Sequence, residues 1–244
     1  MSEPDGIDHI LEDWEFDPLG SNVREIMVGE RHVLQMRIDM GLLQLETEGR
    51  PDGSRPHEMN SFLEYLTSLA NENAELVLDD DQCIEVDREF VQFYHRRVCW
   101  LQLKHFDLAV KDADHTLALM DLCKVHSPSE QWTLSHEQYR PFVLYHRTQA
   151  AALDKLHGDN GPELAIEEVN RGLNSMRELF VAYEAEDQYA QDELVQRLDE
   201  FRENLRDRYE VGKTLKERLA DAISEEQYEL AAELRDRLSK RDSM

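Results

Sequence analysis

Apolar residues recur with two different periods along this chain. Over residues 22–48 they occupy every second position, which is the period of a β-strand and predicts a small antiparallel meander of two or three strands. The alternative is a helix with Leu34, Ile38, Leu42 and Leu45 on one face, but Gly41 disfavours it and marks a bend or bulge instead. Further along, the spacing changes to three and four, so the pattern predicts a mainly α fold with a small N-terminal β meander.

The meander belongs to an expected small α+β region over residues 21–78. Its helix is predicted by an apolar stripe of Met59, Phe62, Leu63, Leu66, Leu69 and Ala70. Residues 1–20 are acidic and interrupted by prolines and glycines, so we expect a flexible tail there. The alternative is a short helix that docks through its apolar residues, which are Ile7, Ile10, Leu11, Trp14 and Phe16.

Two polar stretches could hold ions, but each has a simpler explanation. Residues 49–56 contain two glycines and two prolines and predict a connecting loop, with an anion site around Arg50 as the alternative. Asp79, Asp80 and Asp81 lack the alternating spacing of a calcium loop. We interpret them as the acidic start of a helix, where the helix dipole favours carboxylates.

Residues 79–185 contain an internal repeat. Residues 93–96 (Phe-Tyr-His-Arg) correspond to residues 144–147 (Leu-Tyr-His-Arg), and the small and acidic residues of 109–112 correspond to those of 165–168. Each copy predicts a helix, a tight turn and a second helix, and residues 122–140 would be an inserted connection between the copies.

This pattern resembles the tetratricopeptide repeat, whose period is about 34 residues. Trp100, Phe106 and Ala109 fall on that repeat's aromatic and small-residue positions. Lys104 and Thr116 depart from it, because they stand where the family favours Gly and Ala. The resemblance implies tetratricopeptide-like helical repeats, with flanking helices that cap the two copies.

A long connecting helix is expected over residues 186–212. Leu194, Leu198, Phe201 and Leu205 follow the four-three alternation that is typical of a coiled coil. The alternation is interrupted near Gly212, where we expect a hinge. This helix would hold the C-terminal segment away from the repeats.

The C-terminal segment, residues 213–244, has the pattern of a helical hairpin. Its first helix carries an apolar stripe of Leu215, Leu219, Ala222 and Ile223, and its second a stripe of Tyr228, Ala231, Ala232, Leu234 and Leu238. Ser224 and Gln227 have the spacing of a capping box that would begin the second helix. Two helices this short are marginal alone, so we expect a partner surface to cover the stripes.

The hairpin resembles the UVR motif, which is named after the excision-repair proteins UvrB and UvrC. That motif has an Ala-Ile pair followed by E-x-[F/Y]-E-x-A-A-x-L-R-D, and residues 222–236 fill every signature position. The resemblance implies pairing with another hairpin of this kind, on a UvrB/UvrC-like or Clp-associated protein or on the chain's own copy as a homodimer. The expected partner-binding residues are Leu215, Leu219, Ala222, Ile223, Glu226, Tyr228, Ala231, Ala232, Leu234, Arg235, Asp236 and Leu238.

The charge distribution bears on the choice of partner. The formal net charge is −26, of which residues 1–87 contribute −17 (5 basic and 22 acidic) and residues 213–244 only −1 (7 basic and 8 acidic). So acidic a chain repels phosphate backbones, and we expect no direct contact with nucleic acid. We therefore expect an interaction or adaptor protein. The alternatives are an accessory factor of nucleotide excision repair that contacts DNA directly, and a Clp-protease regulator.

No motif of an enzyme or of a cofactor site is present in the sequence. It lacks HExxH, GxSxG, the phosphate-binding loop and GxGxxG, so we expect no catalytic residue, cofactor or metal. His95 and Cys99 could share a metal-binding helix face, but no second pair lies nearby. Cys83, Cys99 and Cys123 form no CxxC, and free thiols suit a reducing cytoplasm. The absence of a long apolar run predicts no membrane span and no signal peptide.

Overall fold

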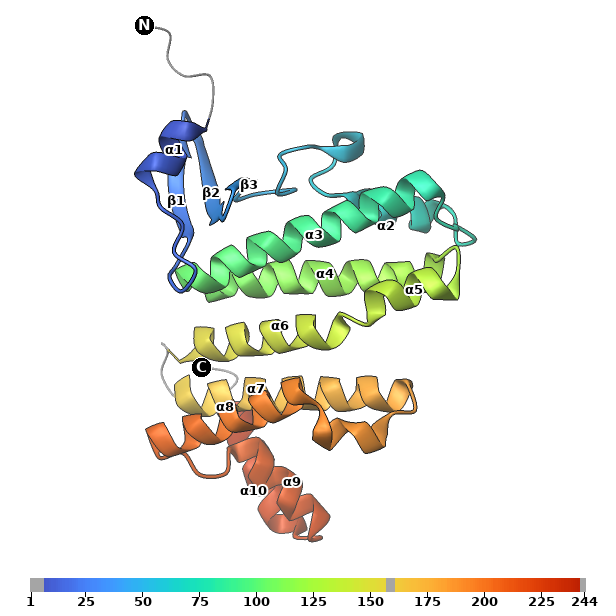
Figure 1. Ribbon diagram of the computed structural model, residues 1–244. Helices are drawn as coiled ribbons and strands as arrows, with labels where there is room; N and C mark the ends of the chain where they lie inside the picture. Colours follow the sequence, from blue (N-terminus) through green and yellow to red (C-terminus); the bar gives the residue numbers. More distant parts are fainter. Residues whose placement is uncertain (1–6, 157–160, 242–244) are drawn as a thin grey trace, which may run out of the picture. The chain divides into compact units, whose positions relative to one another are not determined.

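The computed structural model describes residues 7–156 and 161–241. It confirms a mainly α fold with one small sheet (Figure 1). The chain divides into two compact units, residues 1–143 and 144–244, and the division falls inside one helix, α6.

The first unit contains the sheet and the first helices. Its elements are α1 (Asp8–Asp13), β1 (Val23–Val28), β2 (Arg31–Ile38), β3 (Gly41–Glu46), the 3-10 helix η1 (Pro56–Glu58), α2 (Phe62–Glu72), α3 (Asp80–Leu103), α4 (Phe106–His126), α5 (Glu130–Glu137) and the start of α6 (Arg140–Lys155). The second unit contains the rest of α6, α7 (Gly161–Ala182), the 3-10 helix η2 (Glu186–Gln191), α8 (Glu193–Tyr209), α9 (Leu215–Ser224) and α10 (Tyr228–Arg241).

The sheet is the antiparallel meander that the period of two predicts, in the order β1-β2-β3. Its central strand, β2, buries Val33 and Leu34 completely. The expected bend or bulge at Gly41 is wrong, because Gly41 is the first residue of β3 and pairs with Ile38. The glycine that a turn requires is Gly29, which has φ +63 between β1 and β2.

The described part of the N-terminal segment, residues 7–20, includes the short helix α1 and therefore follows the docked-helix alternative. Just after α1, the carbonyl of Trp14 accepts a hydrogen bond from Arg37 Nε on β2 at 3.1 Å. The guanidinium of Arg24 lies 4.2 Å from the centroid of the Trp14 ring. These two contacts hold the segment against the sheet.

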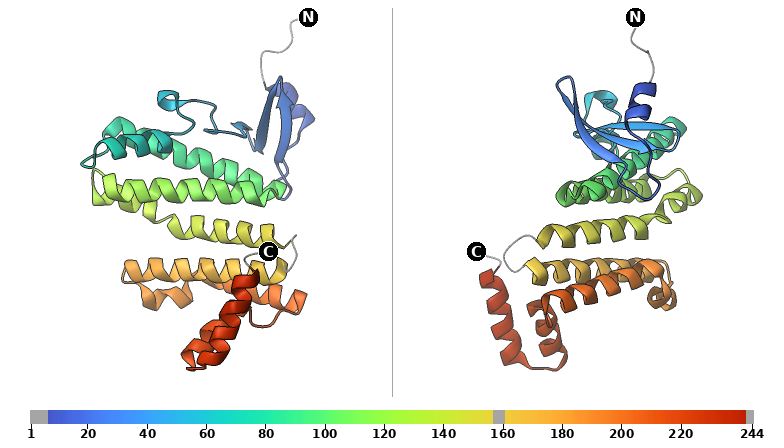
Figure 2. Two further views of the ribbon diagram at one scale, coloured as in Figure 1. Left: turned by 180° about the vertical axis from the view of Figure 1, so that it is seen from behind. Right: turned by 60° about the vertical axis from the view of Figure 1, so that its left-hand side comes forward.

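Helices α3 and α4 run antiparallel, side by side in every view (Figures 1 and 2). A tight turn at Lys104, with φ 64, joins them. A buried ion pair between Arg96 Nη2 and Asp112 Oδ1, at 2.7 Å, links the two helices. Arg96 Nη1 also donates to the carbonyl of Gly49 at 2.8 Å, so the same side chain ties the 49–56 loop to α3.

The arginine of that loop is paired inside the fold. Arg50 is buried and its guanidinium contacts Glu85 at 2.8 Å and Glu89 at 3.4 Å. The Glu89 carboxylate, which is fully buried, also accepts hydrogen bonds from the backbone N–H groups of Phe62 and Leu63 at the start of α2. Protein carboxylates therefore neutralise Arg50, in keeping with a connecting loop.

The three adjacent aspartates, residues 79–81, lie at the N-terminus of α3. Asp79 is the N-cap of α3 and forms a capping box with Gln82, while Asp80 and Asp81 lie in the first turn. The interpretation of these residues as an acidic helix start is confirmed.

The expected repeat copies correspond to the helix pairs α3–α4 and α6–α7. The second pair approaches closely at Gly172, where a β-carbon would lie only 2.0 Å from Thr148 Oγ1. The expected connection over residues 122–140 contains helix α5 and the end of α4. The tetratricopeptide resemblance itself stays a prediction.

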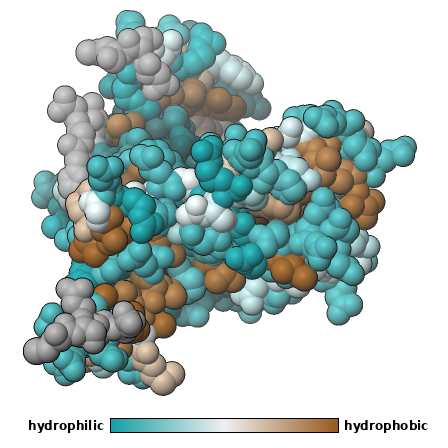
Figure 3. Space-filling model, turned by 90° about the horizontal axis from the view of Figure 1, so that it is seen from above, coloured by the Kyte–Doolittle hydropathy of each residue, from teal (hydrophilic) through white to brown (hydrophobic). Residues whose placement is uncertain are grey.

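The surface is mainly hydrophilic on the face that Figure 3 shows, and apolar residues form separate patches on it. No helix among residues 7–156 and 161–241 is long and apolar enough to cross a membrane. The described part of the chain also has no cluster of three or more His, Cys, Asp or Glu that could hold a metal ion.

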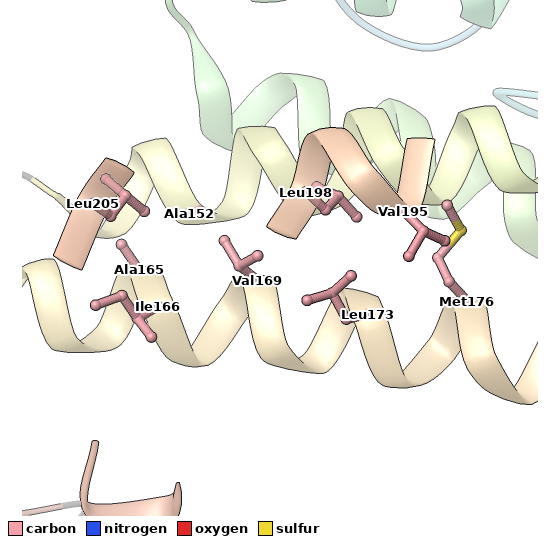
Figure 4. Packing of buried hydrophobic residues seen from close by; sticks show 9 residues of the cluster. All are labelled: Ala152, Ala165, Ile166, Val169, Leu173, Met176, Val195, Leu198 and Leu205. Carbon is pink, nitrogen blue, oxygen red and sulfur yellow. The ribbon is translucent and has the colours of Figure 1, made fainter. Parts of the chain in front are cut away.

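The core of the second unit lies between α6, α7 and α8 (Figure 4). It contains Ala152, Ala165, Ile166, Val169, Leu173, Met176, Val195, Leu198 and Leu205. Leu198 and Leu205 of α8 are buried in this core. Helix α8 therefore packs against α7 and does not extend away from the unit as a separate connecting helix.

The single long helix expected over residues 186–212 is wrong. The segment contains η2, then α8, then a loop. Asp192 separates η2 from α8, because its carboxylate accepts hydrogen bonds from the N–H groups of Leu194 and Val195 as an N-cap. Glu210, with φ 53, ends α8 two residues before Gly212, so the interruption predicted there is confirmed.

Candidate functional site

Helix α9 begins at a capping box that the sequence pattern did not single out. Thr214 N–H donates to Glu217 Oε2 at 2.7 Å, and Glu217 N–H donates to Thr214 Oγ1 at 3.2 Å. The capping box predicted at Ser224 and Gln227 is wrong, because Ser224 is the last residue of α9. Its hydroxyl donates to the carbonyl of Asp221 at 2.8 Å.

The turn between α9 and α10 has the hydrogen bonds of a Schellman motif. Gln227 N–H donates to the carbonyl of Ala222 at 2.7 Å, and Glu226 N–H to that of Ile223 at 3.1 Å. Glu226 has φ 58, in the left-handed region that glycine usually occupies. A residue with a side chain there costs roughly 1 kcal/mol, so glycine would be more stable at this position.

Helices α9 and α10 are neighbours in the structure (Figure 2), and the side chains of their inner faces pack against each other. Ala222, Ala231 and Leu234 are buried in this seam, and Leu215 and Leu219 pack partly buried against it. The two alanines have small side chains, which allows the close approach of the helices. Five of the predicted contact residues are therefore used within the hairpin, and a sixth, Leu238 on α10, is also buried.

A second set of apolar side chains stays exposed near the turn. Ile223 is 56% exposed, Tyr228 70% and Leu230 38%. These three residues are called the tip patch below. The sequence pattern missed Leu230, which lies off the stripe of α10 and could have been found as an apolar residue outside the helix's buried face.

The remaining predicted contact residues are also at the surface of the hairpin. Ala232, Arg235 and Asp236 are exposed on α10, and Arg235 Nη2 lies 3.4 Å from Asp236 Oδ1. Glu226 is exposed in the turn and borders an open hollow that Tyr228 and Leu230 also line. The structure therefore divides the predicted residues into a closed seam and an accessible surface.

The hairpin is attached to α7 of the same unit through charged groups. Nη1 and Nη2 of Arg241 donate to the two oxygens of the buried Glu167 carboxylate, at 2.8 and 3.0 Å. Lys216 Nζ lies 2.8 Å from the same carboxylate. The N–H of Leu215 donates to Glu163 Oε1 at 2.8 Å. Sequence analysis missed this attachment, because Glu163 and Glu167 have no signal that separates them from the many other acids.

Glu217 connects α9 with both α7 and α8. Its Oε1 accepts hydrogen bonds from Asn170 Nδ2, at 2.9 Å, and from Arg206 Nη2. Burial alone would raise the pKa of Glu217, but the hydrogen bonds from Thr214 N–H, Asn170 and Arg206 outweigh burial and hold the pKa below its ordinary value. The carboxylate is therefore ionised at neutral pH and stabilises the base of the hairpin.

The three cysteines are free and buried, and each pKa is raised by burial, to about 12 for Cys99 and Cys123. They are thus protonated thiols at neutral pH and poor nucleophiles. Cys99 lies one helical turn from His95, but the described residues hold no third ligand beside them.

Comparison with known proteins identifies the hairpin. The family model described as "UvrB/uvrC motif" matches residues 211–240, which include α9 and nearly all of α10. The match covers the hairpin alone and says nothing of the helices before it. No curated protein and no solved structure matches the chain.

Proposed function

We propose that this chain is a non-enzymatic interaction or adaptor protein whose α9–α10 hairpin pairs with another UVR hairpin. The partner hairpin belongs to a UvrB/UvrC-type or Clp-associated protein, or to a second copy of the chain. The observation that carries the proposal is the tip patch, which stays exposed on a hairpin whose inner seam is already closed. The free buried thiols are consistent with a reducing cytoplasm.

The tip patch has the chemistry that helix pairing needs. Burying an exposed Ile or Tyr side chain contributes about 1.5–3 kcal/mol, so Ile223 and Tyr228 together would supply several kcal/mol. The exposed Ala232 adds a small side chain past which a second helix can approach closely. The attachment to α7 leaves the patch accessible, because its contacts involve residues 215–217 and 241 at the other end of the hairpin.

Charge favours a partner with basic residues around its own apolar surface. Glu225, Glu226 and Glu229 are exposed beside the tip patch. A partner with Lys or Arg at the rim would pair with these carboxylates, whereas two identical tips would bring like charges together.

The left-handed backbone conformation of Glu226 also supports a partner with basic residues. The position would be more stable with glycine, so the chain retains a charged side chain at a local cost. A contact between this carboxylate and a basic partner would offset that cost.

The test compares Ile223→Asp with the matched control Ile84→Asp, which introduces the same charge at an isoleucine that is 57% exposed on α3. Full-length proteins are mixed with the UVR hairpins of UvrB, of UvrC and of the Clp-associated proteins from the same organism, and self-association is followed by light scattering. We expect Ile223→Asp to abolish the complex that forms and Ile84→Asp to leave it intact. If Ile223→Asp retained both its partner and its mass, or if the wild-type chain formed no complex at all, the proposal would be wrong.

A further inference from the structure

The first unit contains a pocket that the interaction function does not use. It lies between α3, α4, α5 and the start of α6 and has a volume of about 710 Å³, which is the size of a small-molecule site. Its walls are mainly apolar: Phe90, Tyr94, Met120, Phe142 and Val143 line it. Val91 and Tyr139 are more than half exposed and mark its rim.

One cation lines this apolar pocket. Arg97 is only 1% exposed, and its Nη1 donates to Thr116 Oγ1 at 3.0 Å. Its guanidinium carbon lies 5.8 Å from the centroid of the Tyr94 ring. The buried Nε has no hydrogen-bond partner. Among residues 7–156 and 161–241, no carboxylate forms a salt bridge with Arg97.

The nearby acids are engaged with other groups. Asp112 favours the charged form of Arg97, but both of its oxygens accept hydrogen bonds from Arg96, at 2.7 to 3.3 Å. Asp87, which also lines the pocket, has Oδ1 at 2.7 Å from His136 Nε2. Burial lowers the pKa of Arg97 to about 10, which leaves the side chain protonated at neutral pH.

A buried charge without a partner is costly, and a bound anion beside it would offset that cost. We propose that the pocket binds a small organic anion, a carboxylate on an aromatic or aliphatic body. The carboxylate pairs with the Arg97 guanidinium, which can present two parallel N–H donors to it. The body packs against Phe90, Tyr94 and Met120. This site is separate from the hairpin and does not depend on the proposed function.

The test uses 2-naphthoate as the anionic probe and 2-naphthamide as its neutral counterpart, each titrated into the full-length protein by calorimetry. We expect the wild-type chain to bind naphthoate at least about 10-fold more tightly than the amide, because only the carboxylate pairs with Arg97. Arg97→Met should remove that preference. Arg88→Met, on the same helix, removes an equal charge from an exposed side chain and should leave the preference unchanged.

A second variant, which leaves the buried arginine in place, tests the pocket if Arg97→Met does not fold. Val91→Trp places a large side chain at the exposed rim and should weaken the binding of both probes. The proposal is wrong if wild-type protein binds neither probe at millimolar concentration, if it binds both equally, or if Arg97→Met keeps the preference for naphthoate. It is also wrong if Val91→Trp leaves binding of both probes unchanged.

Discussion

One buried carboxylate, that of Glu167, contributes three of the contacts that attach the hairpin to α7, and Glu167→Gln tests their contribution. The substitution keeps the size of the side chain and removes its charge. In the wild-type chain the carboxylate accepts two hydrogen bonds from Arg241, at 2.8 and 3.0 Å, and lies 2.8 Å from Lys216 Nζ. An amide offers one acceptor oxygen, so the two-point contact with Arg241 is lost.

The expected cost follows from those contacts. Hydrogen bonds that involve charged groups contribute about 1.5–3 kcal/mol each, and the amide keeps part of one of them. The Lys216 pair is half exposed and adds little. We therefore expect local opening of the hairpin to become easier by about 2 kcal/mol, which corresponds to roughly 30-fold faster amide hydrogen exchange in α9 and α10.

Hydrogen exchange measured by mass spectrometry on peptides of α9 and α10 is the assay. Glu168→Gln is the matched control, because this neighbour on α7 pairs only with Arg171, an exposed side chain, among the ion pairs of the described residues. Its substitution should leave exchange in the hairpin almost unchanged. Unchanged exchange in Glu167→Gln, or equal acceleration in both variants, would refute the reasoning.

Three further predictions concern the same hairpin and the charge of the chain. Because the pKa of Glu217 is lowered in the folded state, its stabilising contribution is present above its ordinary value of 4.5 and is lost as the pH falls through the folded-state pKa. The melting temperature of Glu217→Gln should thus lie below that of wild type at neutral pH, and the gap should shrink as the pH falls through the folded-state pKa; a gap of equal size in neutral and in acidic buffer would contradict this. Glu226→Gly should raise the stability of the hairpin by about 1 kcal/mol in thermal unfolding while weakening partner binding, and tighter binding would count against a role for this carboxylate. With a net charge of −26, the chain should shift no duplex DNA in a low-salt gel, and a shift would revive the alternative of direct DNA contact.

Local periodicity was enough to predict the elements whose own residues determine them. The period of two over residues 22–48 predicts the sheet, and the stripes through Leu219 and Leu234 predict both helices of the hairpin. These features are local, so a short stretch of sequence carries the whole signal.

The wrong predictions concern helix ends, where more than one residue has the pattern of an N-cap. Thr214 with Glu217 and Ser224 with Gln227 both have capping-box spacing, and only the folded backbone shows that the first pair begins a helix while Ser224 ends one. The helix predicted over residues 186–212 is too long, because the sequence does not show whether Asp192 lies inside a helix or is the N-cap of a new one.

The least predictable features depend on contacts between residues far apart in the chain. Glu167 meets Arg241 across 74 positions. Within the described part of the chain no carboxylate forms a salt bridge with Arg97, and the nearby Asp112 pairs with Arg96. The chain has 53 acidic residues, and their spacing does not distinguish the buried Glu167 and Asp112 from the solvent-exposed ones. The division of the hairpin into a closed seam and an exposed tip patch also required the structure.

Cross-linking at the tip patch tests the central claim most directly. A photoreactive phenylalanine analogue replaces Ile223 in the full-length chain, and the same analogue at Ile84 serves as the control in cells of the source organism. We predict that position 223 captures peptides from a UVR hairpin, of another protein or of a second copy, and that position 84 does not. Capture at position 223 of peptides that lie outside any such hairpin, or no capture at all, would contradict the account.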